Sequence, residues 1–349
     1  MATGPTIDGF EELTLIGRGA SGTVYRAHQG EMNRQVAIKI LSATTTDPNA
    51  RERFRREVRA LGELSGHPNI VTVYTSGTTD DDQPYLVMGL MERDITGVGP
   101  VDEDTAVDYI GQVAKGLAVA HDAGVLHRDI KPANIFLDRY GTLRLGDFGL
   151  VGLSDTATMT QSSVGSPAYM APELLGNSRA SAASDIYALG VTLYELVEGA
   201  LPFRMGAGGV AGLLHTIISA DPEPPTRMSA GLATFVHRCL AKDPAERPQS
   251  VAEFLADLHD LLEFAFQINM AAYVVFGETS HRREQQRQVT LERIDSQRDL
   301  RRAVEADRWG LSDLDTEGET GIAHNPGYQQ RNSALPHTNL LAECEGCFQ

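Results

Sequence analysis

The chain has 349 residues, of which 42% are hydrophobic, and it carries a formal net charge of −17 at pH 7. This length exceeds one ordinary domain and allows about 250 to 270 residues to form a two-lobed unit with a sizeable core. The charge argues against nucleic-acid binding, because a phosphate backbone repels a strongly negative surface that has no local basic patch.

Three cysteines are too few to build a disulfide framework in a chain of this length. Cys344 and Cys347 form a lone CxxC pair, which is weak support for zinc binding or redox chemistry without a second ligand pair. The N-terminal residues have neither a basic leader nor an apolar core, so we expect no signal peptide and a cytoplasmic location. Arginine greatly outnumbers lysine, which hints at a GC-rich bacterial genome.

Hydrophobic and polar residues alternate over residues 10–41, which follow an N-terminal lead of residues 1–9. The apolar positions are Leu13, Leu15, Val24, Val36, Ile38 and Ile40. The alternation predicts an antiparallel sheet that is interrupted by a glycine cluster.

The cluster contains Gly17, Gly19 and Gly22 in a GxGxxG pattern. The same pattern is the dinucleotide-binding fingerprint, but there it should open a helix. Residues 23–27 continue as a strand instead, which favours a flexible hairpin that covers phosphates. A glycine-rich hairpin without a ligand is the remaining interpretation of the cluster taken alone.

Lys39 ends an apolar strand, where an unpaired buried ammonium costs several kcal/mol. A candidate partner is Glu57, in a predicted helix over residues 51–64. Phe54, Val58 and Leu61 mark the buried face of that helix. Its other charged residues are interpreted as a solvated face.

Two further apolar strands are predicted over residues 69–74 and 84–91, joined by an acidic turn at residues 80–82. A short helix is expected after them. A buried helix follows from Thr105 to Ala123, because its apolar residues recur at helical spacing. His67 and His121 are interpreted as structural residues.

Residues 127–134 carry a carboxylate, an ammonium and a carboxamide at spacings that chemistry on a phosphate requires. Asp129 can accept the proton of an attacking hydroxyl, Lys131 can neutralise phosphate charge, and Asn134 offers an oxygen to a hard cation. A short hairpin over residues 135–145 follows. Asp147 comes just past its end and supplies a second metal-seeking carboxylate.

Taken together, these motifs resemble those of eukaryote-like bacterial serine/threonine protein kinases. Further matching motifs are Asp147-Phe148-Gly149, Ala171-Pro172-Glu173, the apolar helix that opens at residues 184–190, and Arg247. The resemblance covers residues 10–262 and implies an α+β, bilobal fold. Its small lobe, residues 10–91 with the hinge, is an antiparallel sheet with one helix, and its larger lobe, residues 92–262, is mainly helical.

The resemblance implies ATP and Mg²⁺ as cofactors, with Asp129 and Lys131 as catalytic residues and Asn134 and Asp147 as metal ligands. It implies a nucleotide site made of Ile16, Gly17, Gly19, Gly22, Val24, Ala37, Lys39, Glu57, Met88, Gly89, Met91 and Phe136. Lys39 and Glu57 would form the ion pair of the active state. Gly89 departs from the family, whose members commonly carry an acidic residue there. Asp185 would brace the catalytic loop, and Arg247 would pair with Glu173.

The implied substrates are serine and threonine hydroxyls of proteins, including the chain's own segment 147–173. Within it Thr160 is the leading phosphorylation site, followed by Ser162 and Ser163, and Arg128 would hold the phosphate. Thr156 and Thr158 are further candidates, whereas Ser166 is expected to be structural. A homodimer could form during activation. The alternative is a nucleotide-binding pseudokinase scaffold, which usually lacks the lysine, the base or the metal acid, and here all three are present.

Residues 261–276 are apolar, but they are short for a membrane span and contain Glu263. A packed extension of the last helix is therefore preferred over a span, and no membrane contact is expected. Residues 263–310 are interpreted as a helical extension and residues 311–349 as a disordered tail.

Overall fold

The computed structural model describes residues 5–19, 22–42, 48–148, 167–176, 178–206 and 208–261, without the side chains of residues 48–51, 53 and 57. The chain divides into two units, 1–273 and 274–349, and every described residue belongs to the first. The helical extension, the tail, the CxxC pair and the phosphorylation sites predicted at residues 156–163 lie outside the described residues, as does Ser166.

The N-terminal part of the chain forms a five-stranded antiparallel sheet in the order β1-β2-β3-β5-β4. Its strands are β1 (Phe10–Gly19), β2 (Gly22–Gln29), β3 (Arg34–Leu41), β4 (Val73–Thr78) and β5 (Pro84–Gly89). One face buries Val36, Ile38 and Ile40, as their alternation predicts, and Ile7 joins the same cluster. The sheet core therefore reaches into the predicted N-terminal lead.

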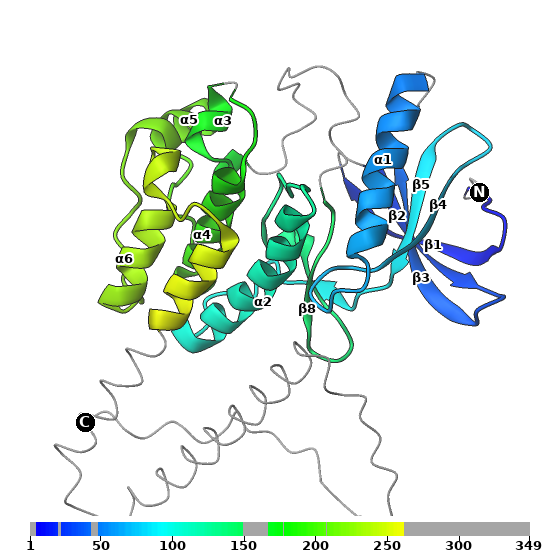
Figure 1. The fold of residues 1–349 in the computed structure, drawn as a ribbon, viewed down its shortest axis with the longest axis horizontal. Helices are drawn as coiled ribbons and strands as arrows, with labels where there is room; N and C mark the ends of the chain where they lie inside the picture. Colours follow the sequence, from blue (N-terminus) through cyan, green and yellow to red (C-terminus); the bar gives the residue numbers. More distant parts are fainter. Residues whose placement is uncertain are drawn as a thin grey trace, which may run out of the picture. The chain divides into compact units, whose positions relative to one another are not determined.

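Helix α1 (Pro48–Leu64) lies against the other face of this sheet (Figure 1). Phe54 of the helix packs with Leu41 and Leu86 of the sheet, and Val58 lies beside them. The helical face predicted from the sequence is thus the face that is buried.

The strand predicted over residues 69–74 is misplaced, because β4 begins at Val73. Ile70 and Val71 are buried, but they pair with the neighbourhood of β8 (Leu143–Leu145) rather than with β5. The Val71 amide donates to the carbonyl of Leu145 at 2.9 Å. A short apolar run has the same sequence pattern whether it forms a strand of the sheet or packs against the neighbouring lobe.

The short helix expected after β5 is wrong for the described chain, because residues 90–102 contain no helix. They contain β6 (Arg93–Asp94), which pairs with β7 (Ile135–Leu137) in a small sheet ordered β6-β7-β8. The Ile95 amide lies 3.0 Å from the carbonyl of Ile135 and 3.3 Å from that of Pro132. The backbone amide of this segment is therefore satisfied by β7 and the loop before it instead of by a helical turn.

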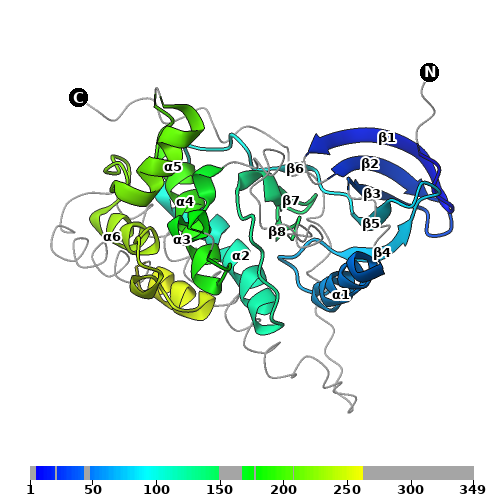
Figure 2. The same cartoon turned by 90° about the horizontal axis from the view of Figure 1, so that it is seen from above.

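The larger lobe is mainly helical (Figure 2). Its helices are α2 (Glu103–Asp122), α3 (Pro172–Leu175), α4 (Ala182–Glu198), α5 (Gly209–Ser219) and α6 (Ala230–Cys239), and residues 251–261 are also helical. Helix α4 is buried over most of its length. A Cβ at Gly190 would lie 2.7 Å from that of Cys239, so glycine allows α4 and α6 to approach closely. The fold is the α+β, two-lobed arrangement that the sequence predicts.

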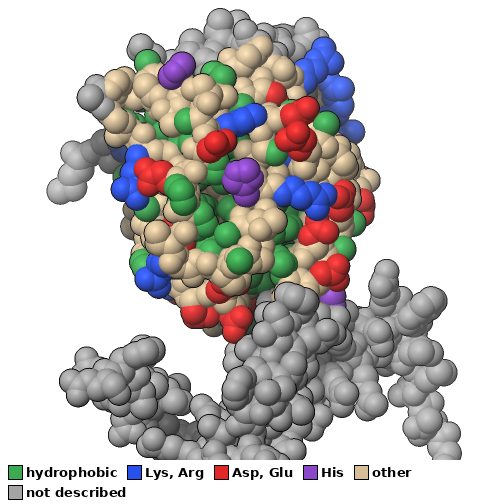
Figure 3. Space-filling view, turned by 90° about the vertical axis from the view of Figure 1, so that its left-hand side faces the viewer, with side chains coloured by type: hydrophobic (Ala, Val, Ile, Leu, Met, Phe, Trp, Pro, Cys, Tyr) green, Lys and Arg blue, Asp and Glu red, His purple; other side chains and the backbone are tan. Residues whose placement is uncertain are grey.

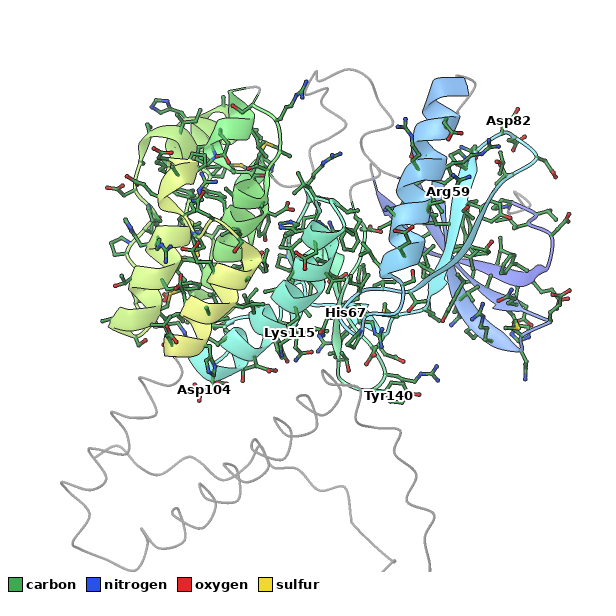
Figure 4. The ribbon with its side chains drawn as sticks, in the orientation of Figure 1. Arg59, His67, Asp82, Asp104, Lys115 and Tyr140 are labelled. Atoms are coloured by element: carbon green, nitrogen blue, oxygen red, sulfur yellow. The ribbon has the colours of Figure 1, made fainter. Side chains whose placement is uncertain are left out.

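Acidic and basic side chains are mixed over the face formed by α5 and α6 (Figure 3). Within the described ranges, no helix is both long and apolar enough to span a membrane. The apolar stretch predicted to pack as an extension begins where the described residues end.

Candidate active site

The carboxylate of Asp129 is the meeting point of the polar loop at residues 127–134. Lys131 Nζ donates to both of its oxygens, at 2.9 and 2.7 Å. Asn134 Nδ2 lies 2.9 Å from Asp129 Oδ2 and 2.6 Å from the Asp129 carbonyl oxygen. Asn134 is held in a short 3₁₀ turn, η1 (Pro132–Asn134). The structure brings the three predicted groups into contact.

A second carboxylate, that of Asp185 in the first turn of α4, holds the backbone of this loop. It accepts hydrogen bonds from the backbone amides of His127 at 2.9 Å and Arg128 at 2.8 Å. His121 Nε2 lies 2.8 Å from the same carboxylate. These bonds hold Arg128 at a φ of 67°, a left-handed conformation that costs free energy for a residue with a side chain. The bracing contacts expected of Asp185 are confirmed, and His121 adds a contact to the same carboxylate.

His127 links the loop to the segment that precedes Asp147. Its Nε2 lies 2.8 Å from the carbonyl oxygen of Gly146, and its Nδ1 accepts from the Asp129 amide at 3.3 Å. Its ring also contacts that of Phe148, with centroids 4.7 Å apart. These partners require a neutral imidazole with the proton on Nε2. Burial lowers the pKa of His127 below its ordinary value, which keeps the ring neutral.

Asp147 and Lys39 join the two lobes. Lys39 Nζ lies 2.9 Å from Asp147 Oδ2, and the lysine side chain is almost fully buried. Asp147 has a φ of 55° and follows Gly146, where a Cβ would approach Val71 to 2.8 Å. The predicted partner Glu57 lies on α1, but its side chain is outside the described set. Among the described side chains, Asp147 is the partner of Lys39.

The two predicted metal ligands lie on connected segments, because the Gly146 amide donates to the Asn134 carbonyl at 3.0 Å. Asn134 uses its Nδ2 group toward Asp129, so Oδ1 is the atom of this side chain that can bind a cation. In the described ranges no cluster of three or more His, Cys, Asp or Glu side chains could hold a metal ion. A pair of oxygen ligands suits Mg²⁺, which retains waters and binds substrate phosphates.

The residues predicted to bind a nucleotide come from neighbouring strands. Lys39 pairs with Val24 on one side, and Ala37 pairs with Met88 on the other. Of the remaining predicted residues, Ile16, Gly17 and Gly19 lie on β1, Gly22 begins β2, Gly89 ends β5, Met91 follows it, and Phe136 lies on β7. A Cβ added at Gly146 would lie 2.9 Å from Cε2 of Phe136, so the predicted nucleotide residues reach the neighbour of Asp147.

Gly22 is required by the fold as well as by its motif. Its φ is 154°, and a Cβ there would lie 2.2 Å from the carbonyl oxygen of Ile40. Gly17 and Gly19 have space for a Cβ, so the geometry does not force glycine at these two positions. Ala20 and Ser21, at the tip of the hairpin, lie outside the described residues.

Glu173 and the fully buried Arg247 form a bidentate ion pair, with both N–O distances at 2.8 Å. The guanidinium also donates to the carbonyl of Ala183 at 3.0 Å and to that of Ala241 at 2.8 Å. This pair was expected from the sequence and is confirmed. It anchors α3, and hence the end of segment 147–173, to the C-terminal helices.

The sequence interpretation missed a hydrogen bond beside the catalytic loop, in which the Tyr169 hydroxyl donates to the Glu195 carboxylate. Tyr169 lines a hollow together with Arg128, Asp129, Met170 and Leu174. Burial raises the pKa of Tyr169 and also that of Glu195. The available signal was a glutamate within the apolar run of α4, where an acid needs a donor.

Comparison with known proteins gives a consistent result. The family model of the protein kinase domain matches residues 10–258. The chain is similar to serine/threonine-protein kinase PknK of Mycobacterium tuberculosis, with 39% identity over 72% of this chain and 24% of that protein. It is also similar to the probable serine/threonine-protein kinase PknB of Corynebacterium glutamicum, with 36% identity over 78% of this chain and 45% of that protein.

A solved structure is similar as well. A mutant of the Mycobacterium tuberculosis PknI kinase domain superimposes with a TM-score of 0.58 and 28% sequence identity. The match covers 74% of this chain and 98% of the solved one. The chain spans less than half of the length of the curated relatives that it matches.

Proposed function

The chain belongs to the protein kinase domain family, and from this premise we propose that it transfers the γ-phosphoryl group of ATP to serine and threonine hydroxyls of proteins. The observation that carries the proposal is the convergence of Lys131 and Asn134 on Asp129, together with the ion pair between Lys39 and Asp147. The proposal covers the kinase domain's own activity.

The proposed reaction uses the Asp129 carboxylate as proton acceptor. The substrate hydroxyl oxygen bonds to the γ-phosphorus, and the bond from that phosphorus to the oxygen bridging the β-phosphate breaks. The hydroxyl proton passes to Asp129, and ADP leaves with the electron pair of the broken bond. Lys131 lies within reach of the same carboxylate and neutralises charge on the moving phosphoryl group.

Asn134 and Asp147 are proposed to hold Mg²⁺, and Lys39 to contact the phosphates of ATP. A magnesium ion, when bound, supplies positive charge that neutralises phosphate oxygens. Lys39 Nζ already lies 2.9 Å from the Asp147 carboxylate. When a nucleotide binds, the ammonium would therefore contact a phosphate in addition to, or instead of, that carboxylate. The strand residues from Ile16 to Ala37, the hinge residues 88–91 and Phe136 would enclose the adenosine part.

We also propose that the chain phosphorylates its own segment 147–173, with Thr160 as the leading site and a second copy as partner during activation. The support is the position of Arg128. Asp185 holds its backbone amide, and Arg128 lines the same hollow as Tyr169. A phosphate could form about one to three charge-assisted hydrogen bonds with such a cation. We place the protein in the cytoplasm, which the sparse cysteines favour.

A pseudokinase scaffold is the competing function, and the complete set of lysine, base and metal acid disfavours it. The experiment is transfer of labelled phosphate from ATP to a generic acceptor protein, with and without Mg²⁺, followed by identification of the modified amino acids. We expect magnesium-dependent label on serine and threonine. ATP binding without any phosphate transfer, across several acceptor proteins and the chain itself, would identify a scaffold instead.

A further inference from the structure

Gly89 ends β5 in the middle of the proposed nucleotide site, and the backbone does not require glycine there. Its φ is not left-handed, unlike that of Gly22. A Cβ at position 89 would meet the Met91 methyl carbon Cε at 3.2 Å and the Tyr74 hydroxyl oxygen at 3.7 Å. The first neighbour is the tip of a flexible side chain, whereas at Gly22 the obstacle is a carbonyl oxygen. Gly89 therefore makes room for a side chain rather than for a backbone.

The position of Gly89 in the sheet defines which side this space is on. Successive residues of a strand point to opposite faces. Met88 packs beside Leu86, which pairs with Lys39, so Met88 shares the face of the catalytic lysine. Gly89 belongs to the opposite face, and its amide is fixed by a 2.9 Å hydrogen bond to the Thr72 carbonyl. The Met91 methyl group thus packs behind the strand end, away from the side of Lys39.

Tyr74 lies beside this space, with its hydroxyl oxygen 3.7 Å from an added Cβ, and Arg34 lies against Tyr74. The Arg34 guanidinium lies 3.6 Å from the centroid of the Tyr74 ring. Arg34 Nε is held in place by a 2.7 Å hydrogen bond to Gln29 Oε1. Met91 is half-buried, and its methyl carbon occupies the gap left by the missing Cβ.

We propose that Gly89 is a positioning residue for the nucleotide, acting through Met91. By leaving the volume that the Met91 methyl group occupies, Gly89 fixes the path of residues 89–91 and so the backbone groups of Met91 that face the adenine. The inference rests on the proposed function, since it needs a nucleotide in this site. A larger residue at position 89 displaces the methyl group, moves the Met91 backbone and weakens ATP binding, with little effect on the phosphate chemistry at Asp129.

The test is a double-mutant cycle on ATP affinity, measured by calorimetric titration of ATP and Mg²⁺ into the full chain. The variants are Gly89→Ala, Met91→Ala and the double substitution. We expect each single change to raise the Kd by about two- to tenfold, the range for coupled residues in contact. The double variant should bind no more weakly than Met91→Ala, because without the methyl group the added Cβ displaces nothing.

Three controls keep the outcome interpretable. Gly62→Ala, at an exposed helical position with no atom within 4 Å of the added Cβ, should leave the Kd unchanged. Turnover of Gly89→Ala at saturating ATP should match wild type while the KM for ATP rises, a split that general damage to the fold does not produce. Thermal melting identifies a variant that fails to fold, and Met91→Ala then carries the test alone.

Additive effects in the cycle, or a Gly89→Ala or Met91→Ala variant that binds ATP as wild type does, would overturn the positioning role and leave the proposed function intact. Absence of ATP binding by the wild-type chain would overturn both. ATP binding without phosphate transfer would overturn the proposed function, and a non-additive cycle in that chain would still support the role of Gly89.

Discussion

The catalytic loop at residues 127–134 and the junction between Lys39 and Asp147 are held in different ways. The loop rests on supports that are almost fully buried, such as Asp185, which accepts two of its backbone amides. At the junction, the described contacts of Lys39 comprise one ion pair, and the Asp147 side chain is 28% exposed. The Asp129 side chain is exposed to a similar degree, 39%.

This difference separates two kinds of residue. Supports are buried and carry many hydrogen bonds, so their loss should unfold the protein. The two carboxylates assigned to chemistry, Asp129 and Asp147, are partly exposed, so their loss should reduce turnover and leave stability nearly unchanged. Partial exposure also lets the Asp129 carboxylate reach a substrate hydroxyl.

The largest effect is expected when a buried support loses its charge. Arg247→Met leaves the Glu173 carboxylate without its bidentate partner in a buried place, and the free energy of unfolding should fall by about 3 to 5 kcal/mol. Urea denaturation measures the change. The control is Arg204→Met, which breaks an exposed pair with Glu223 and should cost at most about 1 kcal/mol. Equal stability of the two variants would remove the distinction between supports and surface pairs.

The next effect concerns the junction. Lys39→Met should lower phosphate transfer by about 10²- to 10³-fold, the usual loss when one charged or polar stabiliser of a transition state is removed. The methionine fills a strand end that is already apolar, so the melting temperature should stay close to that of wild type. A chain that unfolds after this substitution would show that the junction is a support as well. Turnover near the wild-type rate would show that the lysine assignment is wrong.

A smaller effect on stability is expected at glycines, and it depends on whether an added Cβ would meet the backbone. Gly22→Ala places a Cβ against the Ile40 carbonyl and should destabilise the protein by about 1 to 3 kcal/mol. Gly62→Ala, in an exposed turn of α1, should instead stabilise it by about 0.5 to 1 kcal/mol, because alanine favours a helix. Denaturation of both variants tests the contrast. A neutral Gly22→Ala would mean that β2 and β3 can separate at no cost.

The smallest effect is a pH dependence of the loop. Burial holds the pKa of His127 below 6.5, so the unfolded chain takes up a proton as pH falls through 6.5 while the folded chain does not. Stability is therefore complete above this pH and is lost below it, by at most about 1.4 kcal/mol per pH unit for this group. Denaturation from pH 8 to pH 5.5 measures the slope. A His127→Asn variant with the same slope as wild type would assign the effect to other groups.

The sequence predicts these regions unequally, for physical reasons. The loop was found because Asp129, Lys131 and Asn134 interact across a few residues, so their spacing already implies their contact. The strands from Phe10 to Leu41 were found because their apolar residues recur at alternate positions, although β3 is buried on both faces. Pairings of distant residues were found only where a resemblance supplied them, as for Glu173 with Arg247.

The errors share a cause. Ile70 and Val71 have the apolar character of a strand, but their partner is the Leu145 neighbourhood of the other lobe, which no local pattern reveals. The helix expected after β5 is absent from residues 90–102 because β7 competes for that backbone. The hydrogen bond between Tyr169 and Glu195 joins residues far apart in the sequence, and their spacing does not indicate that they are in contact.

The separation between supports and chemical groups is tested most directly at Asp129. Substitution by asparagine keeps the shape of the side chain but removes the carboxylate that accepts the proton. ATP affinity and phosphate transfer to an acceptor protein should be measured on the same preparations of wild type and Asp129→Asn, together with their melting temperatures. The account predicts unchanged melting, a similar Kd for ATP and a loss of transfer of about 10² to 10⁴-fold. Transfer at the wild-type rate by the folded variant would contradict it.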